Sequence, residues 1–327
     1  MTLATGIGSM PGDDIAEAVR MVLGELPDLP YLPELPARGA GAGMIGRSLA
    51  LVELDADLQP AGWRLTGTAG GQGRDQRRAQ SLLAQDLDVL EEQAQEYAGA
   101  FKIQTAGPWT LAATVERPRG DRLLADHGAR RELAEALADG LGTHIQDVRK
   151  RVPGISRLVV QVDEPALSGV IAGAIPTASG YGRHRSVDLP EASGLLELVL
   201  DAVVRHGAEP WEHSCAPHTL WSLVRGAGAR ALSVDLALMS PADHDVLATA
   251  LEAGETVALG VVPSLDSAMT DKQVVTAVLR WLDMLGLDPE EHGERIVVTP
   301  TCGLAGASPA YTRTALALVR TSAAALS

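Results

Sequence analysis

The sequence predicts an α/β fold, a (β/α)8 TIM barrel. Short apolar segments rich in β-branched residues alternate along the chain with longer segments that have helical periodicity. Eight of the short segments can be counted as strands, and eight strand–helix units joined by right-handed crossovers close a parallel barrel. Because 327 residues suit one such barrel, we expect residues 1–327 to form a single catalytic domain. A doubly wound open sheet is the structural alternative.

The expected strands are short, and most are followed by a helical pattern. They comprise residues Leu3–Gly8, Gly62–Gly67, Phe101–Thr105, Arg157–Asp163, Glu209–Ser214, Ala231–Asp235, Thr256–Val262 and Arg295–Thr301. The expected helices include residues Gln76–Ala98, Arg130–Arg151, Ala192–His206, Pro217–Gly226, Asp271–Leu285 and Pro309–Ala324. Ser308 before Pro309 is a typical helix start, and Gly286 is a typical helix end.

One stretch, around residues 26–60, interrupts this alternation. Pro27, Pro30, Pro33 and Pro36 lie close together in it, so we expect an irregular Pro-rich insertion that includes a functional loop. The glycines within residues 68–73 are expected to form a connector. They do not make the strand-to-helix Gly-x-Gly-x-x-Gly pattern of a phosphate-binding loop.

Composition limits the partners of the chain. The formal net charge of −15 would repel a phosphate backbone, so nucleic acid is not an expected partner. Apolar stretches such as residues 195–200 are interrupted by charges, here Glu197, so we expect no membrane span. The first residues lack the basic and apolar regions of a secretion signal, and the expected location is therefore the cytoplasm.

The only two cysteines, Cys215 and Cys302, are the clearest chemical signal. Cytoplasmic thiols stay reduced, so metal binding or catalysis is favoured over a disulfide. In a barrel the active site lies at the carboxyl ends of the strands, where His213, Cys215, Asp235 and Cys302 are all expected. Two thiolates, an imidazole and a carboxylate are ligands that zinc accepts in tetrahedral geometry, so these four residues predict a Zn²⁺ site.

Each of these residues also has a purely structural interpretation. A single buried cysteine often behaves as a small hydrophobic residue, and an aspartate at a strand end often caps the next helix. His213 and Cys215 are two positions apart, so on an extended strand both point to the same side and can share one ion. Taken together with the barrel register, the set favours a metal site.

Other strand ends carry polar residues too. Ile7-Gly8-Ser9 follows the first strand, and Gly107-Pro108-Trp109-Thr110 follows the third. Asp163 and Glu164 are adjacent carboxylates after the fourth strand, where one of them could hold a substrate ammonium group. Solvation of a loop and capping of a helix are the alternatives for this acidic pair.

The motifs at these strand ends resemble, in order, those of the catalytic C-terminal barrel of cobalamin-independent methionine synthase, in a short single-barrel form. The resemblance spans nearly the whole chain, and its last three motifs are specific as a set. The motifs are Ile7-Gly8-Ser9, Gly62-Trp63, Gly107-Pro108-Trp109-Thr110, Asp163-Glu164-Pro165-Ala166-Leu167, His213-Ser214-Cys215 and Thr301-Cys302-Gly303-Leu304.

This resemblance implies a zinc-dependent methyltransferase that methylates the thiol of homocysteine to form methionine. By position, it implies that His213, Cys215 and Cys302 are zinc ligands. It also implies that Ile7, Ser9 and Asp163 bind the amino-acid end of homocysteine, and that Glu34 matches a further substrate-binding glutamate. The physical logic agrees, because a thiol with a pKa of about 8.5 is mostly protonated at neutral pH, whereas zinc binds the nucleophilic thiolate.

The sequence departs from that family in three places. The family's fourth ligand is a glutamate, where this chain has Asp235, and Glu212 or an open position are the alternatives. The family's acid histidine after the seventh strand is missing, and Asp266 is the candidate replacement. The second barrel of the double-length enzymes, which helps to enclose the folate, is absent. The methyl donor is therefore expected to be either a methylfolate or a methylcorrinoid, the latter free or on a protein.

Two other functions compete with the methyltransferase. An enzyme like uroporphyrinogen decarboxylase shares the barrel and needs no metal, but it gives His213, Cys215 and Cys302 no role. A noncatalytic zinc-binding barrel would explain why the acid histidine is missing.

Overall fold

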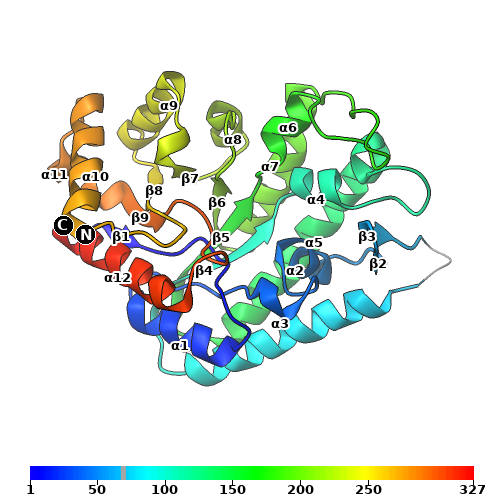
Figure 1. The fold of residues 1–327 in the computed structure, drawn as a ribbon, viewed down its shortest axis with the longest axis horizontal. Helices are drawn as coiled ribbons and strands as arrows, with labels where there is room; N and C mark the ends of the chain where they lie inside the picture. The colour runs from blue at the N-terminus through cyan, green and yellow to red at the C-terminus, as the bar shows by residue number, and fades with distance from the viewer. Residues whose placement is uncertain (68–70) are drawn as a thin grey trace.

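The computed structural model describes residues 1–67 and 71–327, and most of its strands lie in one curled parallel sheet (Figure 1). The sheet runs in the order β1, β9, β8, β7, β6, β5, β4. The fold is a TIM-barrel-like α/β fold, which confirms the predicted class. The strands are β1 (Leu3–Ala4), β4 (Gly99–Ala106), β5 (Ile155–Asp163), β6 (Glu209–Ser214), β7 (Ala231–Asp235), β8 (Thr256–Val262) and β9 (Ile296–Pro300).

The prediction that the second expected strand belongs to this sheet was wrong. Residues Gly62–Leu65 form β3, which pairs with β2 (Ala56–Gln59) in an antiparallel hairpin outside the barrel. Its alternating pattern resembles a barrel strand because a half-buried hairpin strand has the same period of two. The expected connector at 68–73 lies partly outside the described residues.

The gap between β1 and β4 is filled by residues 29–34 of the Pro-rich stretch. The Leu32 amide donates to the Lys102 carbonyl at 3.0 Å, and the Glu34 amide donates to the Gly8 carbonyl at 3.1 Å. This segment therefore pairs with both neighbours and takes the place of the eighth strand. Proline has no backbone N–H to donate. Pro30 and Pro33 are tolerated here because the amides that donate to the neighbouring segments belong to Leu32 and Glu34.

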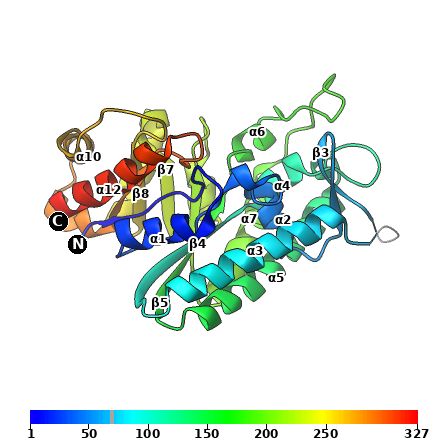
Figure 2. The ribbon, with the colours of Figure 1, turned by 60° about the horizontal axis from the view of Figure 1, so that its bottom comes forward.

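Helices cover the outside of the sheet (Figures 1 and 2). The helix boundaries agree with the signals in the sequence. Ser308 caps the helix that begins at Pro309, and Gly286, in the left-handed conformation, ends another helix. The helices are α1 (Ile15–Glu25), α2 (Met44–Leu51), α3 (Arg74–Gln93), α4 (Pro108–Thr114), α5 (His127–Arg151), α6 (Leu167–Ile171), α7 (Leu189–Arg205), α8 (Trp221–Gly226), α9 (Pro241–Glu252), α10 (Asp271–Leu285), α11 (Pro289–His292) and α12 (Pro309–Ala325). Four short 3-10 turns complete the set: η1 (Pro36–Arg38), η2 (Leu123–Ala125), η3 (Leu236–Leu238) and η4 (Gly293–Arg295).

The inside of the barrel is layered. A dry layer consists of Leu29, Val159, Trp211, Ala231, Ala258 and Val297, which are buried against one another. Two residues further along β5, β6 and β7, the same side of each strand carries Gln161, His213 and Ser233. The inward side chains thus change from apolar to polar toward the carboxyl ends of the strands, where the site lies.

Every helix in the described ranges is too short or too polar to span a lipid bilayer.

Candidate functional site

Three of the four predicted metal ligands meet at the carboxyl ends of β6 and β9. The donor atoms of His213, Cys215 and Cys302 all lie within 4.8 Å of one another. His213 is the inward-facing residue of β6, and Cys215 follows that strand directly. Cys302 follows β9, so residues far apart in the sequence converge on one point, as expected for a barrel.

The orientation of the His213 ring is fixed by β7. Its Nδ1 lies 3.0 Å from the carbonyl oxygen of Ser233, which can only accept, so Nδ1 carries the proton. Nε2 is then a lone-pair donor, and it is buried without a hydrogen-bond partner in the described part of the chain. Burial lowers the pKa of His213 to about 4, so the ring is neutral at physiological pH, as a metal ligand must be.

The two sulfur atoms touch as a disulfide pair, and their Cα atoms are 5.9 Å apart. The sequence favoured reduced cysteines, so this pairing differs from the expectation. The same placement suits two thiolates on one ion, because sulfurs bound to one tetrahedral zinc lie about 3.8 Å apart. With the unpartnered Nε2 beside them, the residues present fit zinc once the cysteines are reduced.

The two candidates for a fourth ligand are placed differently. The Asp235 carboxylate accepts from the Ala237 amide at 3.0 Å and caps η3. Glu212 precedes His213 on β6 and therefore points to the other side of the strand. Both Glu212 oxygens are buried with no partner among the described residues, and burial, with Glu164 and Asp163 nearby, raises its pKa well above the usual range. Neither carboxylate belongs to the group of donors formed by His213, Cys215 and Cys302.

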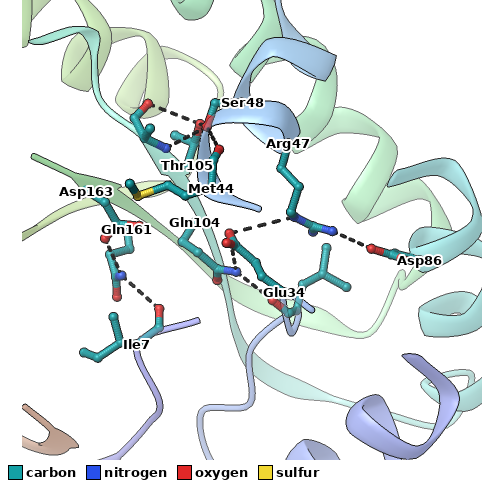
Figure 3. A network of polar contacts seen from close by, with 12 residues as sticks. Ile7, Glu34, Met44, Arg47, Ser48, Asp86, Gln104, Thr105, Gln161 and Asp163 are labelled. Carbon is teal, nitrogen blue, oxygen red and sulfur yellow. Dashed lines mark hydrogen bonds and ion pairs between the residues drawn. The ribbon is translucent and has the colours of Figure 1, made fainter. Parts of the chain in front are cut away.

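A second polar group lies on the neighbouring strands and includes two of the residues expected to bind substrate. Asp163 accepts a hydrogen bond of 2.7 Å from Gln161 Nε2, which also donates to the Ile7 carbonyl at 2.9 Å (Figure 3). Lys102 Nζ donates to the same carbonyl at 2.9 Å and to Gln161 Oε1 at 2.8 Å. Asp163 is the register neighbour of His213 on β6, so this group adjoins the metal ligands.

Glu34 completes the second group from the opposite side. Its carboxylate accepts from Gln104 Nε2 at 3.1 Å and lies 3.8 Å from the guanidinium of Arg47, on α2. Arg47 in turn forms an ion pair with Asp86 of α3 (Figure 3). The Pro-rich stretch therefore supplies a buried carboxylate beside β4, and its substrate-binding role stays a prediction.

Burial dominates the electrostatics of this second group. It raises the pKa of Glu34 and raises the pKa of Asp163 well above the usual range. The Glu34 charge adds to the rise at Asp163, whereas the Lys102 charge lowers the pKa of both carboxylates. Burial likewise lowers the pKa of Lys102 to about 7. The second group thus combines two buried carboxylates, Glu34 and Asp163, with two basic side chains, Lys102 and Arg47.

Ser9 connects the two groups. Its carbonyl accepts from the Leu304 amide at 2.7 Å, which ties the segment after β1 to the loop that carries Cys302. A Cβ atom at Gly303 would lie 2.0 Å from the Ser9 hydroxyl, so only glycine lets these segments approach this closely. The four residues expected to bind substrate thus lie around the same mouth as the sulfurs.

Glu164 and Asp266 have structural contacts. Glu164 turns away from Asp163 and accepts from the backbone amides of Trp109 and Thr110, as the capping alternative predicted. Asp266 is exposed and accepts from the amide and hydroxyl of Ser308, and these hydrogen bonds lower its pKa. A general acid needs a pKa near the working pH, so this conformation suits a helix cap better than a proton donor.

Sequence reasoning missed Lys102, Gln104, Gln161 and Arg47. Lys102 and Gln104 alternate with Phe101 and Ile103 on a strand that is otherwise apolar or small. That period of two places both polar side chains on the inner face, and this signal was readable from the sequence. Arg47 gave no such signal, since its partners are 13 and 39 positions away in sequence.

Comparisons with known proteins agree with the motifs. Residues 101–325 match the family described as cobalamin-independent synthase, catalytic domain. The match begins within β4, so Ile7, Ser9 and Glu34 lie outside it. No curated protein is similar enough in sequence to be matched.

Two solved structures are similar in fold. A B12-independent methionine synthase from Shewanella sp. W3-18-1, in complex with selenomethionine, has a TM-score of 0.65 at 13% identity, over 99% of this chain and 97% of that one. A GH5_18 protein from Streptomyces cattleya, in complex with GlcNAc, has a TM-score of 0.52 at 14% identity, over 99% and 80% of the two chains. At such identities the likeness concerns the fold alone, and the chemistry must be argued from the residues.

Proposed function

The chain belongs to the family of cobalamin-independent synthase catalytic domains, and from that premise we propose that it is a zinc-dependent methyltransferase that converts homocysteine to methionine. The observation that carries the proposal is the meeting of His213 Nε2 with the sulfurs of Cys215 and Cys302 beside a buried acidic site. We assign the zinc to these three residues, with Asp235 as the fourth ligand.

Asp235 can take that place if its carboxylate leaves the Ala237 amide. It lies on the same side of β7 as Ser233, which contacts His213. Burial already raises its pKa, so a nearby metal ion would restore the charge that burial disfavours. When bound, zinc would hold the substrate sulfur as a thiolate.

The residues of the second group bind the other end of the substrate. Homocysteine carries an ammonium group, and the carboxylates of Asp163 and Glu34 are acceptors that suit it, beside Ile7. Ser9, which adjoins the Cys302 loop, lies between this end and the metal ligands. Holding both ends of the substrate fixes the sulfur in position for attack.

The transfer itself forms a bond from the substrate sulfur to the methyl carbon while the bond between that carbon and the donor breaks. A methylfolate leaves from nitrogen and needs a proton, whereas a methylcorrinoid leaves with its electron pair on cobalt and needs none. We propose Asp266 as the proton donor for the first case. In that role it must release Ser308, and its pKa must rise.

An activity assay tests this proposal. The reduced, zinc-loaded protein is supplied with homocysteine and with either methyltetrahydrofolate or methylcobalamin, and methionine is measured. The proposal expects methionine from one of the two donors, and expects Cys302→Ser to lose at least about 100-fold in kcat because zinc then lacks a thiolate ligand. Methionine formation that is equal in Cys302→Ser would contradict it.

Asp266→Asn and Ser308→Ala form a matched pair in the same assay, because each removes one side of the same contact. A proton donor predicts that only Asp266→Asn loses about 100-fold or more in kcat, and only with the methylfolate. Equal kcat in the two variants would leave Asp266 as a helix cap and end its catalytic assignment.

The competing functions make different predictions. A decarboxylase gives His213, Cys215 and Cys302 no role, so their convergence does not favour it. A noncatalytic zinc protein would keep the same metal ligands when a thiol is added, whereas the proposed enzyme would exchange Asp235 for the substrate sulfur. The proposed location is the cytoplasm, where the two cysteines would stay reduced.

A further inference from the structure

The side-chain amide of Gln104 is held in one orientation. Its Nε2 donates to the Leu32 carbonyl at 2.7 Å and to the Glu34 carboxylate at 3.1 Å. Both partners are acceptors, so a flipped amide would set oxygen against oxygen twice. The orientation of Gln104 is therefore determined by its neighbours, and its Oε1 must point away from them.

That oxygen is left without a partner. Gln104 is buried, and Oε1 has no hydrogen bond to any described residue. A buried acceptor that loses its hydrogen bond to water destabilises the protein unless another donor replaces the water. Proteins satisfy nearly all such groups, so a buried, oriented and unpartnered acceptor beside a ligand site indicates that the ligand supplies the donor.

The acceptors around Gln104 favour a cationic donor. Glu34 is bonded to the same amide, and Gln161, which bonds Asp163, is the register neighbour of Gln104 on β5. Gln104 also packs against the segment after β1, since a Cβ atom at Gly8 would lie 2.9 Å from its Cγ. Oε1 is thus one more acceptor beside the carboxylates of Glu34 and Asp163.

We propose that Gln104 Oε1 accepts a hydrogen bond from the α-ammonium group of the substrate, as a third side-chain acceptor beside Glu34 and Asp163. This inference rests on the proposed function and deepens it, because it identifies a residue that selects α-amino acids over the same molecules without the amino group. Gln104 contacts the substrate directly and does not act through the metal.

Binding of L-methionine and of desamino-methionine, which has hydrogen in place of the amino group, tests this assignment without needing catalysis. Both dissociation constants are measured by calorimetry for the wild type and for Gln104→Met, which keeps the length of the side chain but has no amide. The expected result is a loss of about tenfold or more in affinity for methionine and an unchanged affinity for the desamino compound. Equal losses for both compounds would overturn the assignment.

Two further variants separate direct from indirect effects. Thr105→Val is the matched control, because Thr105 is the next residue of β4 and its hydroxyl bonds Ser48 on the other side of the strand; it should change neither affinity. In a Glu34→Gln background, Gln104→Met should still lower the preference for methionine, whereas no further loss would mean that Gln104 acts only through Glu34. If Gln104→Met does not fold, Gln104→Asn, which draws the amide back by one methylene, provides the same comparison.

The Gln104 contact and the proposed methyltransferase activity can fail independently of one another. A wild type that prefers methionine over the desamino compound but transfers no methyl group would refute the methyltransferase and leave the Gln104 contact standing. A wild type with no such preference would overturn the Gln104 contact, whatever its activity.

Discussion

Asp163 and Glu164 are neighbours in the sequence, but they lie in different surroundings. Asp163 faces the mouth and bonds Gln161, whereas Glu164 accepts two backbone amides and the hydroxyl of Thr110 at the start of α4. Glu164 is fully buried, and this burial raises its pKa to about 7 despite those hydrogen bonds. The proposed ligand-binding role of Asp163 and the capping role of Glu164 therefore belong to separate residues of the pair.

The shift at Glu164 predicts how stability depends on pH. The folded pKa of about 7 exceeds the ordinary glutamate value of 4.5, so the folded state holds a proton that the unfolded chain releases. The stabilisation is fully present below pH 4.5 and is lost as the pH rises through 7. Between pH 5 and 7.5 the wild type should lose about 2 kcal/mol of unfolding free energy relative to Glu164→Gln, which has no proton to release.

Urea unfolding of both proteins at the two pH values, with the metal content held equal, measures this difference. Comparing the two proteins cancels the opposite trend from His213, whose pKa is lowered. A constant gap between wild type and Glu164→Gln at pH 5 and 7.5 would contradict the assigned pKa.

At this same scale, the convergence of His213, Cys215 and Cys302 was readable from the sequence because cysteine and histidine have few roles in a reduced barrel, and their role as zinc ligands stays a prediction. Gln104 and Lys102 were not identified, although their alternation along β4 indicated their inward direction. Their function depends on Glu34, Ile7 and Gln161, which come from other elements. Such partners become known only when the barrel brings them together.

Among the elements, the segment 29–34 differs most from expectation. The four prolines of residues 26–60 led to the prediction of an irregular insertion, and a barrel strand was predicted at Gly62–Gly67 instead. In the structure the prolines avoid the positions that donate hydrogen bonds, and Leu29 joins the dry inner layer. The other seven strands were predicted within a few residues because their apolar runs have the length and spacing of buried parallel strands.

Hydrogen exchange tests whether this segment acts as the eighth barrel strand. The amides of Leu32 and Glu34 donate to backbone carbonyls on both sides, so they should exchange as slowly as the amides of β4. The exposed residues near Gly39 should exchange much faster and serve as an internal control. Rapid exchange at Leu32 and Glu34 would show that the barrel is open between β1 and β4.

At the scale of the whole molecule, the two ends of the chain meet. The Thr2 amide donates to the Ser327 hydroxyl at 2.8 Å, and both termini lie at the same edge of the barrel (Figures 1 and 2). β1 pairs with β9, so the first and last strands of the chain are neighbours. This closure is consistent with the prediction that residues 1–327 form one domain, which stays a prediction.

One domain should unfold in one step. Tryptophans at positions 63, 109, 211, 221 and 281 report on hairpin, barrel and helices together. Their fluorescence and the far-ultraviolet circular dichroism should therefore follow a single coincident transition in urea. Two separated transitions would divide the chain into independent units.

The central claim is that this barrel activates a thiol on zinc held by His213, Cys215 and Cys302. The most direct measurement is the zinc content of the reduced protein, followed by the zinc X-ray absorption edge with and without homocysteine, each repeated on Cys302→Ser. The account predicts one zinc per chain, a new sulfur ligand when homocysteine is added, and loss of zinc or of one sulfur in the variant. A protein that binds no zinc after reduction, or whose zinc ligands do not change with homocysteine, would contradict it.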